Sequence, residues 1–177
     1  MSDPHYPIGK FSYTGPLTAE QKHQCLTDIE QTPARLRAGL HGLSDQQLNT
    51  PYRDGGWTLR QVAHHVPDSH MNCYIRFKLA LTEDAPVIKP YSEPLWGELP
   101  DARLGPIEPS LNLLAALHLR WVAAWRALAP PDWLRTFHHP RSGSAVSLDR
   151  LAALYAWHGR HHVAQVRALR VRSGWAE

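Results

Sequence analysis

The sequence has few of the features that mark secreted, membrane-spanning or disulfide-stabilised proteins. Only two of its 177 residues are cysteine, Cys25 and Cys73, and both fall in segments with helical periodicity, so no disulfide framework is expected. The longest apolar stretch, residues 111–128, is interrupted by His118 and two arginines, whereas a membrane-spanning helix needs about 20 apolar residues. The first residues hold an early acid and two prolines instead of the apolar core of a secretory signal. We therefore expect a cytoplasmic protein with no membrane segment.

The chain also has little excess of charge of either sign. The 19 basic and 16 acidic residues give a net charge of +3. The most concentrated basic stretch, near the C-terminus, has no interleaved aromatic residues, so nucleic-acid binding is not expected. With 43% hydrophobic and 20% charged residues, the chain has the composition of a folded soluble protein. Its length predicts a single domain over residues 1–177.

Strand patterns are nearly absent, because no segment alternates apolar and polar residues for more than a few positions. Hydroxyl residues with N-cap spacing predict where the helices begin. These are Thr18, Ser44, Thr58, Ser110 and Ser147. The main helices are expected at about residues 18–40, 58–82, 110–128 and 147–172. This pattern predicts an all-α four-helix bundle with long crossover loops.

Prolines modify this scheme at three places. Pro33 is expected to end or kink the first helix, and Pro67 to kink the second, because a proline inside a helix removes a hydrogen bond at a cost of about 3 kcal/mol. Residues 83–109 contain six prolines and are predicted to form a long loop that acts as a lid, a binding loop or a dimer arm. The large apolar side chains of this segment need a packing partner; they are Tyr91, Trp96 and Leu99.

Histidine is abundant, with twelve in the chain. Six of them form two groups, His64, His65 and His70, and His158, His161 and His162. On a helical wheel His158 and His162 lie one turn apart at the centre of the buried stripe of the last helix. Two imidazoles in this spacing can supply two nitrogen ligands to one metal ion. They can equally be core histidines that hydrogen-bond to neighbouring helices, and the pair alone leaves both interpretations open.

The second helix offers candidates for a third ligand. On its wheel, His65 lies on a polar stripe beside the apolar face, His70 points toward the core, and His64 points nearly opposite to it. Periodicity therefore leaves both His65 and His70 as candidates. The alternative is one core histidine and two surface histidines with no metal.

Four motifs carry a family resemblance. They are GGWTLRQVAHHVPDSHMNCYIRFKLALTE at residues 55–83, LHLRWV at 117–122, FHHP at 137–140 and YAWHGRHH at 155–162. Together they resemble the YfiT-type branch of the DinB-like metalloproteins over nearly the whole chain, with Pro67 as a departure from the family pattern. The resemblance implies a homodimeric four-helix bundle that holds one divalent metal per subunit through His65, His158 and His162. Three neutral imidazoles suit zinc best, with nickel as the other candidate.

The chemistry of such a site has two main interpretations. Three histidines leave one tetrahedral position open, either for a water molecule whose pKa falls to about 7 or for a substrate thiol held as thiolate. The sequence has no HExxH motif, and Asp149 is the nearest acid on the last helix, so the thiolate is mildly favoured. The resemblance implies a metal-dependent hydrolase, and related proteins are similar to S-transferases that use a low-molecular-weight thiol such as bacillithiol. A non-enzymatic metal-binding bundle is the third alternative.

A small-molecule substrate needs polar contacts, and three residues are candidates: Arg76, Asn72 and Arg160. Each is also of a type that is commonly a solvated surface group. Arg76 shares the polar stripe of His65, whereas Arg160 faces away from the ligands on its wheel, so Arg76 is the preferred anchor for a substrate carboxylate.

Overall fold

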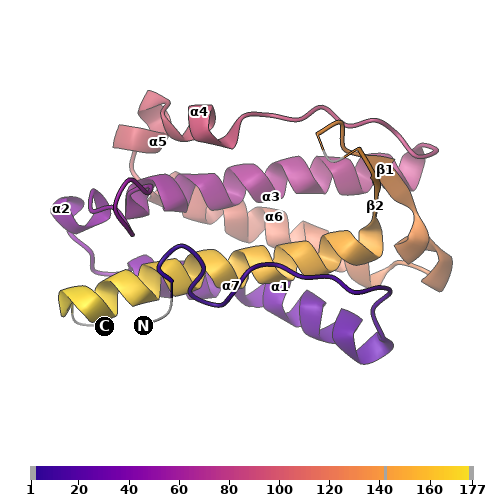
Figure 1. Cartoon of the computed structure of the whole chain (residues 1–177), viewed down its shortest axis with the longest axis horizontal. Helices are drawn as coiled ribbons and strands as arrows, with labels where there is room; N and C mark the ends of the chain where they lie inside the picture. The colour runs from indigo at the N-terminus through magenta and orange to yellow at the C-terminus, as the bar shows by residue number, and fades with distance from the viewer. Residues whose placement is uncertain (1–2, 142, 176–177) are drawn as a thin grey trace.

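The computed structural model describes residues 3–141 and 143–175, and within these ranges four long helices lie side by side as a bundle (Figure 1). They are α1 (Ala19–Leu40), α3 (Leu59–Thr82), α6 (Glu108–Arg126) and α7 (Leu148–Ser173). The connections contain the short helices α2 (Asp45–Leu48), α4 (Glu93–Gly97) and α5 (Pro100–Leu104) and the 3-10 helix η1 (Pro130–Leu134). The predicted four-helix bundle with long crossovers is confirmed. None of the described helices is long and apolar enough to cross a membrane.

Side-chain caps fix most helix starts. Thr18, Ser44 and Thr58 each form the complete capping box with a glutamine three residues later, and Ser147 accepts a hydrogen bond from the backbone of Arg150. The predicted cap at Ser110 is wrong, because α6 begins two residues earlier, at Glu108, with a proline in its first turn. The Ser110 hydroxyl lies instead 2.7 Å from Nδ1 of His64, so a tertiary contact uses it.

Both internal prolines lie within continuous helices. Pro33 does not end α1, which runs unbroken from Ala19 to Leu40, and Pro67 lies inside α3. Packing against the other helices offsets the missing backbone hydrogen bond in each case.

The segment 83–109 is more ordered than the sequence indicated. It forms α4 and α5, so Trp96 lies inside a helix, and its ring packs against that of Tyr91 with 4.5 Å between centroids. Two side chains of α3 attach the segment to the bundle. Gln61 donates to the carbonyl of Gly97, and Arg60 donates to that of Gly105.

A small hairpin was also not expected from the sequence. Strands β1 (Thr136–His138) and β2 (Ala145–Ser147) pair antiparallel, with Phe137 opposite Val146. Both of these side chains are buried, while their strand neighbours are not. Three residues per strand are too few for alternation to be visible in the sequence.

The N-terminal arm crosses the outer face of α7 (Figure 1). The buried carboxylate of Asp149 accepts hydrogen bonds from the Tyr13 hydroxyl and the Leu17 backbone. Further along α7, the indole of Trp157 donates to the carbonyl of Gly9. The N-terminal arm is therefore attached along the last helix.

The core consists of two apolar clusters. One is built around Trp121, Trp125 and Phe77, and the other around Leu59 and Val166. Along α7, Tyr155 belongs to the first cluster and Val163 to the second. His158 and His162 lie between these two residues in sequence, so the fold places them where the apolar packing is interrupted.

Candidate metal centre

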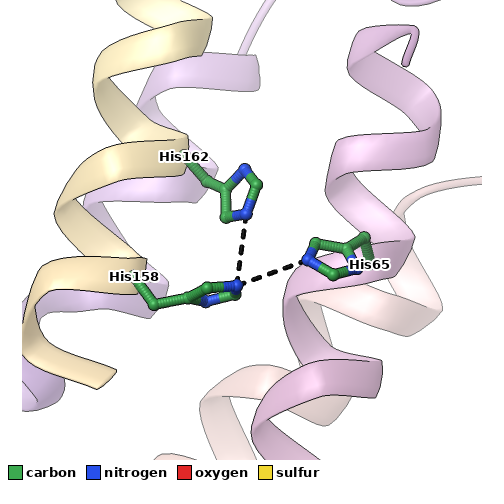
Figure 2. Close-up of side chains that lie close together, drawn as sticks. All are labelled: His65, His158 and His162. Carbon is green, nitrogen blue, oxygen red and sulfur yellow. Dashed lines mark hydrogen bonds between the residues drawn. The ribbon is translucent and has the colours of Figure 1, made fainter. Parts of the chain in front are cut away.

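Three histidines from two helices converge inside the bundle (Figure 2). Nε2 of His158 lies 3.3 Å from Nε2 of His65 and 3.2 Å from Nε2 of His162. One ring nitrogen from each histidine lies within 4.8 Å of those of the other two. The α3 helix supplies His65, and one turn of α7 separates the other two.

These distances fit a divalent metal. Two nitrogens bound to zinc at 2.0–2.1 Å with tetrahedral angles lie about 3.3 Å apart. The His158–His65 and His158–His162 separations of 3.3 and 3.2 Å match that edge. Three imidazoles around one point form a donor set typical of zinc, nickel or another borderline metal.

Burial keeps the three imidazoles neutral. The pKa values of His65, His158 and His162 are all well below the usual range, because desolvation penalises the charged ring and the neighbouring histidines add repulsion. A metal ligand must be the neutral form of histidine, so no proton has to leave these rings at neutral pH before a metal binds.

Gln165 orients His162 and was missed by the sequence analysis. Its Oε1 lies 2.9 Å from His162 Nδ1, and its Nε2 lies 2.9 Å from Nε2 of His161 and donates to the carbonyl of His5. Because an amide oxygen can only accept, the proton of His162 is on Nδ1, which leaves Nε2 free for a metal. The signal in the sequence is the spacing of three residues between His162 and Gln165 on one helix face. His161 helps to fix the amide.

Two cavities lie near the cluster, and a cluster residue lines one of them. One of about 280 Å³ is lined by His161 and His162 together with Trp57, and its wall includes His5 of the N-terminal arm. The ring of Trp57 also packs on His65, with 4.4 Å between centroids.

The second cavity, also about 280 Å³, is lined by Arg76, Leu154 and Tyr155 and by the hairpin residues Phe137 and Val146. Tyr155 lies between this cavity and the cluster, because it lines the cavity and its ring centroid lies 5.5 Å from that of His158.

The three candidate substrate contacts have different surroundings. Arg76 lines the second cavity, and its Nη2 is buried without a hydrogen-bond partner among the described residues. Asn72 donates to the backbone carbonyl of Asp68 in its own helix. Arg160 donates to the buried carboxylate of Asp28 at 3.0 Å, so the structure does not bring it to the histidine cluster.

The remaining histidines of α3 are both buried. His64 was expected to face away from the core, and this is wrong, because its ring contacts Ser110 and the carbonyl of Gly105 under the α5 segment. The wheel could not show that a distant loop covers this face. His70 points into the core, as its position on the wheel predicted, with no exposed surface.

Fold and site together define the class of protein: a four-helix bundle with an internal cluster of three histidines suited to one metal ion. The sequence model of the DinB superfamily, a protein family, matches residues 28–166 of the chain. The chain belongs to this superfamily.

Several relatives match over almost the full length. A protein of Bacillus mycoides (strain KBAB4) is 52% identical over 175 residues, which are 99% of this chain and 100% of that protein, and is named "putative metal-dependent hydrolase". A protein of the same name from Bacillus cereus (strain 03BB102) is 51% identical with the same coverage.

A solved structure also matches over almost the full length. YfiT from Bacillus subtilis superposes with a TM-score of 0.95 at 45% identity, covering 98% of this chain and 99% of that one. It is described as "a probable metal-dependent hydrolase with an unusual four-helix bundle topology". The resemblance to the YfiT-type branch is thus confirmed.

Proposed function

We propose that this protein is a metal-dependent hydrolase that binds one divalent metal through His65, His158 and His162. Zinc is the preferred candidate for this metal, and nickel is the other. The observation that carries this proposal is the convergence of the three ring nitrogens, with two separations equal to the edge of a zinc tetrahedron. The names of the full-length relatives support the same activity.

The protein's own groups prepare this centre. When bound there, a divalent metal supplies an open coordination position, Lewis acidity and a lowered pKa of a coordinated water. Gln165 holds His162 in the ligating tautomer, and Trp57 covers one side of His65. The cavity lined by His161 and His162 gives a small substrate space to approach the cluster.

A second candidate is thiol S-transfer. Among the described residues, no carboxylate is hydrogen-bonded to or paired with the three histidines. A thiol needs less help from a base than water does, because coordination itself favours the thiolate. This observation favours a low-molecular-weight thiol such as bacillithiol as the alternative substrate.

Metal analysis and turnover test the proposal together. After reconstitution with zinc we expect about one equivalent per chain, and metal-dependent cleavage of ester or amide substrates. Well under half an equivalent would contradict the metal site. Thiol conjugation without any hydrolysis would select the S-transferase, and a metal-loaded protein with neither activity would support a non-enzymatic bundle.

Arg76 is proposed to anchor an anionic group of the substrate. Arg76 lines the second cavity, which Tyr155 also lines, and its Nη2 is buried without a hydrogen-bond partner among the described residues. We expect Arg76→Ala to raise the KM for a carboxylate-bearing substrate about 10-fold to 100-fold, with kcat changed little, since a charge-assisted hydrogen bond contributes about 1.5–3 kcal/mol. Steady-state kinetics measures KM and kcat, and metal analysis checks that the variant still holds its metal.

Arg103→Ala is the matched control, because that exposed arginine pairs with Glu98 away from both cavities. An unchanged KM in Arg76→Ala, or a loss of metal, would remove Arg76 as the anchor.

We propose that the protein is a homodimer. Tyr91 and Trp96 pack on each other, but Leu95, Leu99 and Leu104 of the same segment are 68%, 49% and 78% exposed. Several exposed large apolar side chains in one segment support a partner contact. Light scattering at micromolar concentration is expected to give about 40 kDa, twice the 20.0 kDa of one chain, and a monomer mass would reject the dimer.

A further inference from the structure

Two buried histidines form a row behind His158. His70 of α3 is 0% exposed and His118 of α6 is 2% exposed. Nδ1 of His158 lies 3.0 Å from Nε2 of His70, whose Nδ1 lies 2.8 Å from Nε2 of His118. Nδ1 of His118 lies 2.6 Å from the backbone carbonyl oxygen of Ile29 in α1. One continuous row of hydrogen bonds therefore connects α1 to the histidine cluster through α6 and α3.

The carbonyl of Ile29 sets the direction of the whole row. A carbonyl oxygen can only accept, so His118 carries its proton on Nδ1. A neutral imidazole has one donor and one acceptor, so His118 Nε2 accepts from His70 Nδ1, and His70 Nε2 accepts from His158 Nδ1. Nε2 of His158 is then left without a proton, and it is the nitrogen that faces His65 and His162.

The surroundings keep the row neutral and in place. The Trp121 ring meets both His70 and His118 edge-on, at 5.9 and 5.8 Å between centroids, and Tyr155 meets His70 at 4.9 Å. Burial lowers the pKa of His118 to about 4 and places that of His70 well below its usual range. All four ring nitrogens of the two residues have a partner, so no competing hydrogen bond turns either ring.

A proline explains why the Ile29 carbonyl is available. In an α-helix the carbonyl of a residue accepts from the backbone N–H four positions later. For Ile29 that position is Pro33, which has no N–H. The helical partner is therefore missing at the one carbonyl of α1 to which His118 donates.

We propose that Pro33, His118 and His70 are positioning residues that hold His158 in the tautomer presenting Nε2 to the metal. This inference rests on the ligand role of His158 proposed above. Gln165 imposes the same tautomer on His162, so two unprotonated nitrogens face each other at 3.2 Å, an arrangement that a cation between them stabilises. Because the row ends at a carbonyl, it fixes orientation and does not carry a proton out of the site.

The tautomers can be measured directly in the unsubstituted protein. Nitrogen-15 NMR of ring-labelled histidine, recorded without metal, is expected to show His70, His118 and His158 protonated on Nδ1. A His158 ring protonated on Nε2 would overturn the proposal. This measurement needs neither metal nor variant, so it stands whether or not the proposed metal function fails.

Zinc affinity tests the consequence for binding. His118→Leu removes the group that orients His70, and we expect it to weaken Zn²⁺ binding about 10-fold to 100-fold, the usual effect of losing a residue that orients a ligand. In this variant the proton of His158 is expected to move from Nδ1 to Nε2. Zn²⁺ binding within about twofold of the unsubstituted protein, with the His158 tautomer unchanged, would contradict the positioning role of His118.

Pro33→Ala tests why the Ile29 carbonyl is available to His118, without disturbing the core. It restores an N–H that competes for the Ile29 carbonyl, so we expect a smaller loss of Zn²⁺ affinity than in His118→Leu. Unchanged affinity and tautomer in this variant would overturn the role of Pro33.

His64→Leu is the matched control, because it also deletes a buried histidine of the bundle, one that contacts Ser110 and Gly105 instead of the row. It is expected to lower thermal stability while leaving Zn²⁺ affinity and the His158 tautomer unchanged. A loss of affinity equal to that of His118→Leu would show that general destabilisation explains both.

Discussion

Replacing His158 or His162 by alanine is expected to abolish metal binding. Each substitution removes one of three convergent nitrogens, and because losing even a residue that only orients a ligand costs 10–100-fold in affinity, we expect a loss of about 100-fold or more. Isothermal titration with zinc measures it. Zinc at 100 times its Kd stabilises a folded protein by about 2.7 kcal/mol, which corresponds to about 5–10 °C in Tm for a chain of this size. We expect this increase in the unsubstituted protein and not in the variants.

The other histidines of α3 give the controls for this experiment. His64→Ala should retain the zinc-dependent increase in Tm, since its ring binds Ser110 and not the cluster. His65→Ala should lose it. Full affinity in His65→Ala together with complete loss in His70→Ala would show that the third ligand is His70. The assignment of His65 from the family motif, which contains Pro67, would then be wrong.

Gly159→Ala is expected to destabilise the protein, although alanine is the better helix former by up to about 1 kcal/mol. The reason is the contact between α1 and α7, the most extensive helix pair of the bundle. A Cβ at position 159 would lie 2.8 Å from Cγ2 of Thr32 and closer still to its hydroxyl oxygen. Overpacking of this kind typically costs about 1–3 kcal/mol. Since His158 is the adjacent residue, we also expect weaker zinc binding; chemical denaturation and titration measure the two effects.

Two comparisons make the interpretation of Gly159→Ala specific. Thr32→Ala removes the two closest atoms, so the double variant should recover part of the lost stability. Gly39→Ala lies in the same helix pair but would meet only Val166, at 3.2 Å, and is expected to be much milder. Equal effects at positions 39 and 159, or no recovery in the double variant, would contradict the steric explanation.

Local signals in the sequence predicted the elements that depend on local interactions. Capping boxes place the starts of α1, α2 and α3, and the spacing of His158 and His162 places them on one helix face. His65 required the family motif, because periodicity alone could not separate it from His70.

Three of the errors share one physical cause, which is contact between residues distant in sequence. Ser110 does not cap α6 because its hydroxyl is used by His64, 46 residues earlier. His64 is buried because the α5 segment lies over it. Pro33 does not end α1, because packing of the whole helix outweighs one missing hydrogen bond. A single sequence read by its local pattern does not contain such pairings.

Pro33 has a consequence for protein engineering. A redesign guided by helix propensity would replace a proline in the middle of α1 early, because a proline there is disfavoured by about 3 kcal/mol relative to alanine. The same change would restore an N–H that competes with His118 for the Ile29 carbonyl. Thermostability and metal affinity are therefore expected to move in opposite directions at this residue, so stabilised versions of the bundle should be selected with zinc binding as a second criterion.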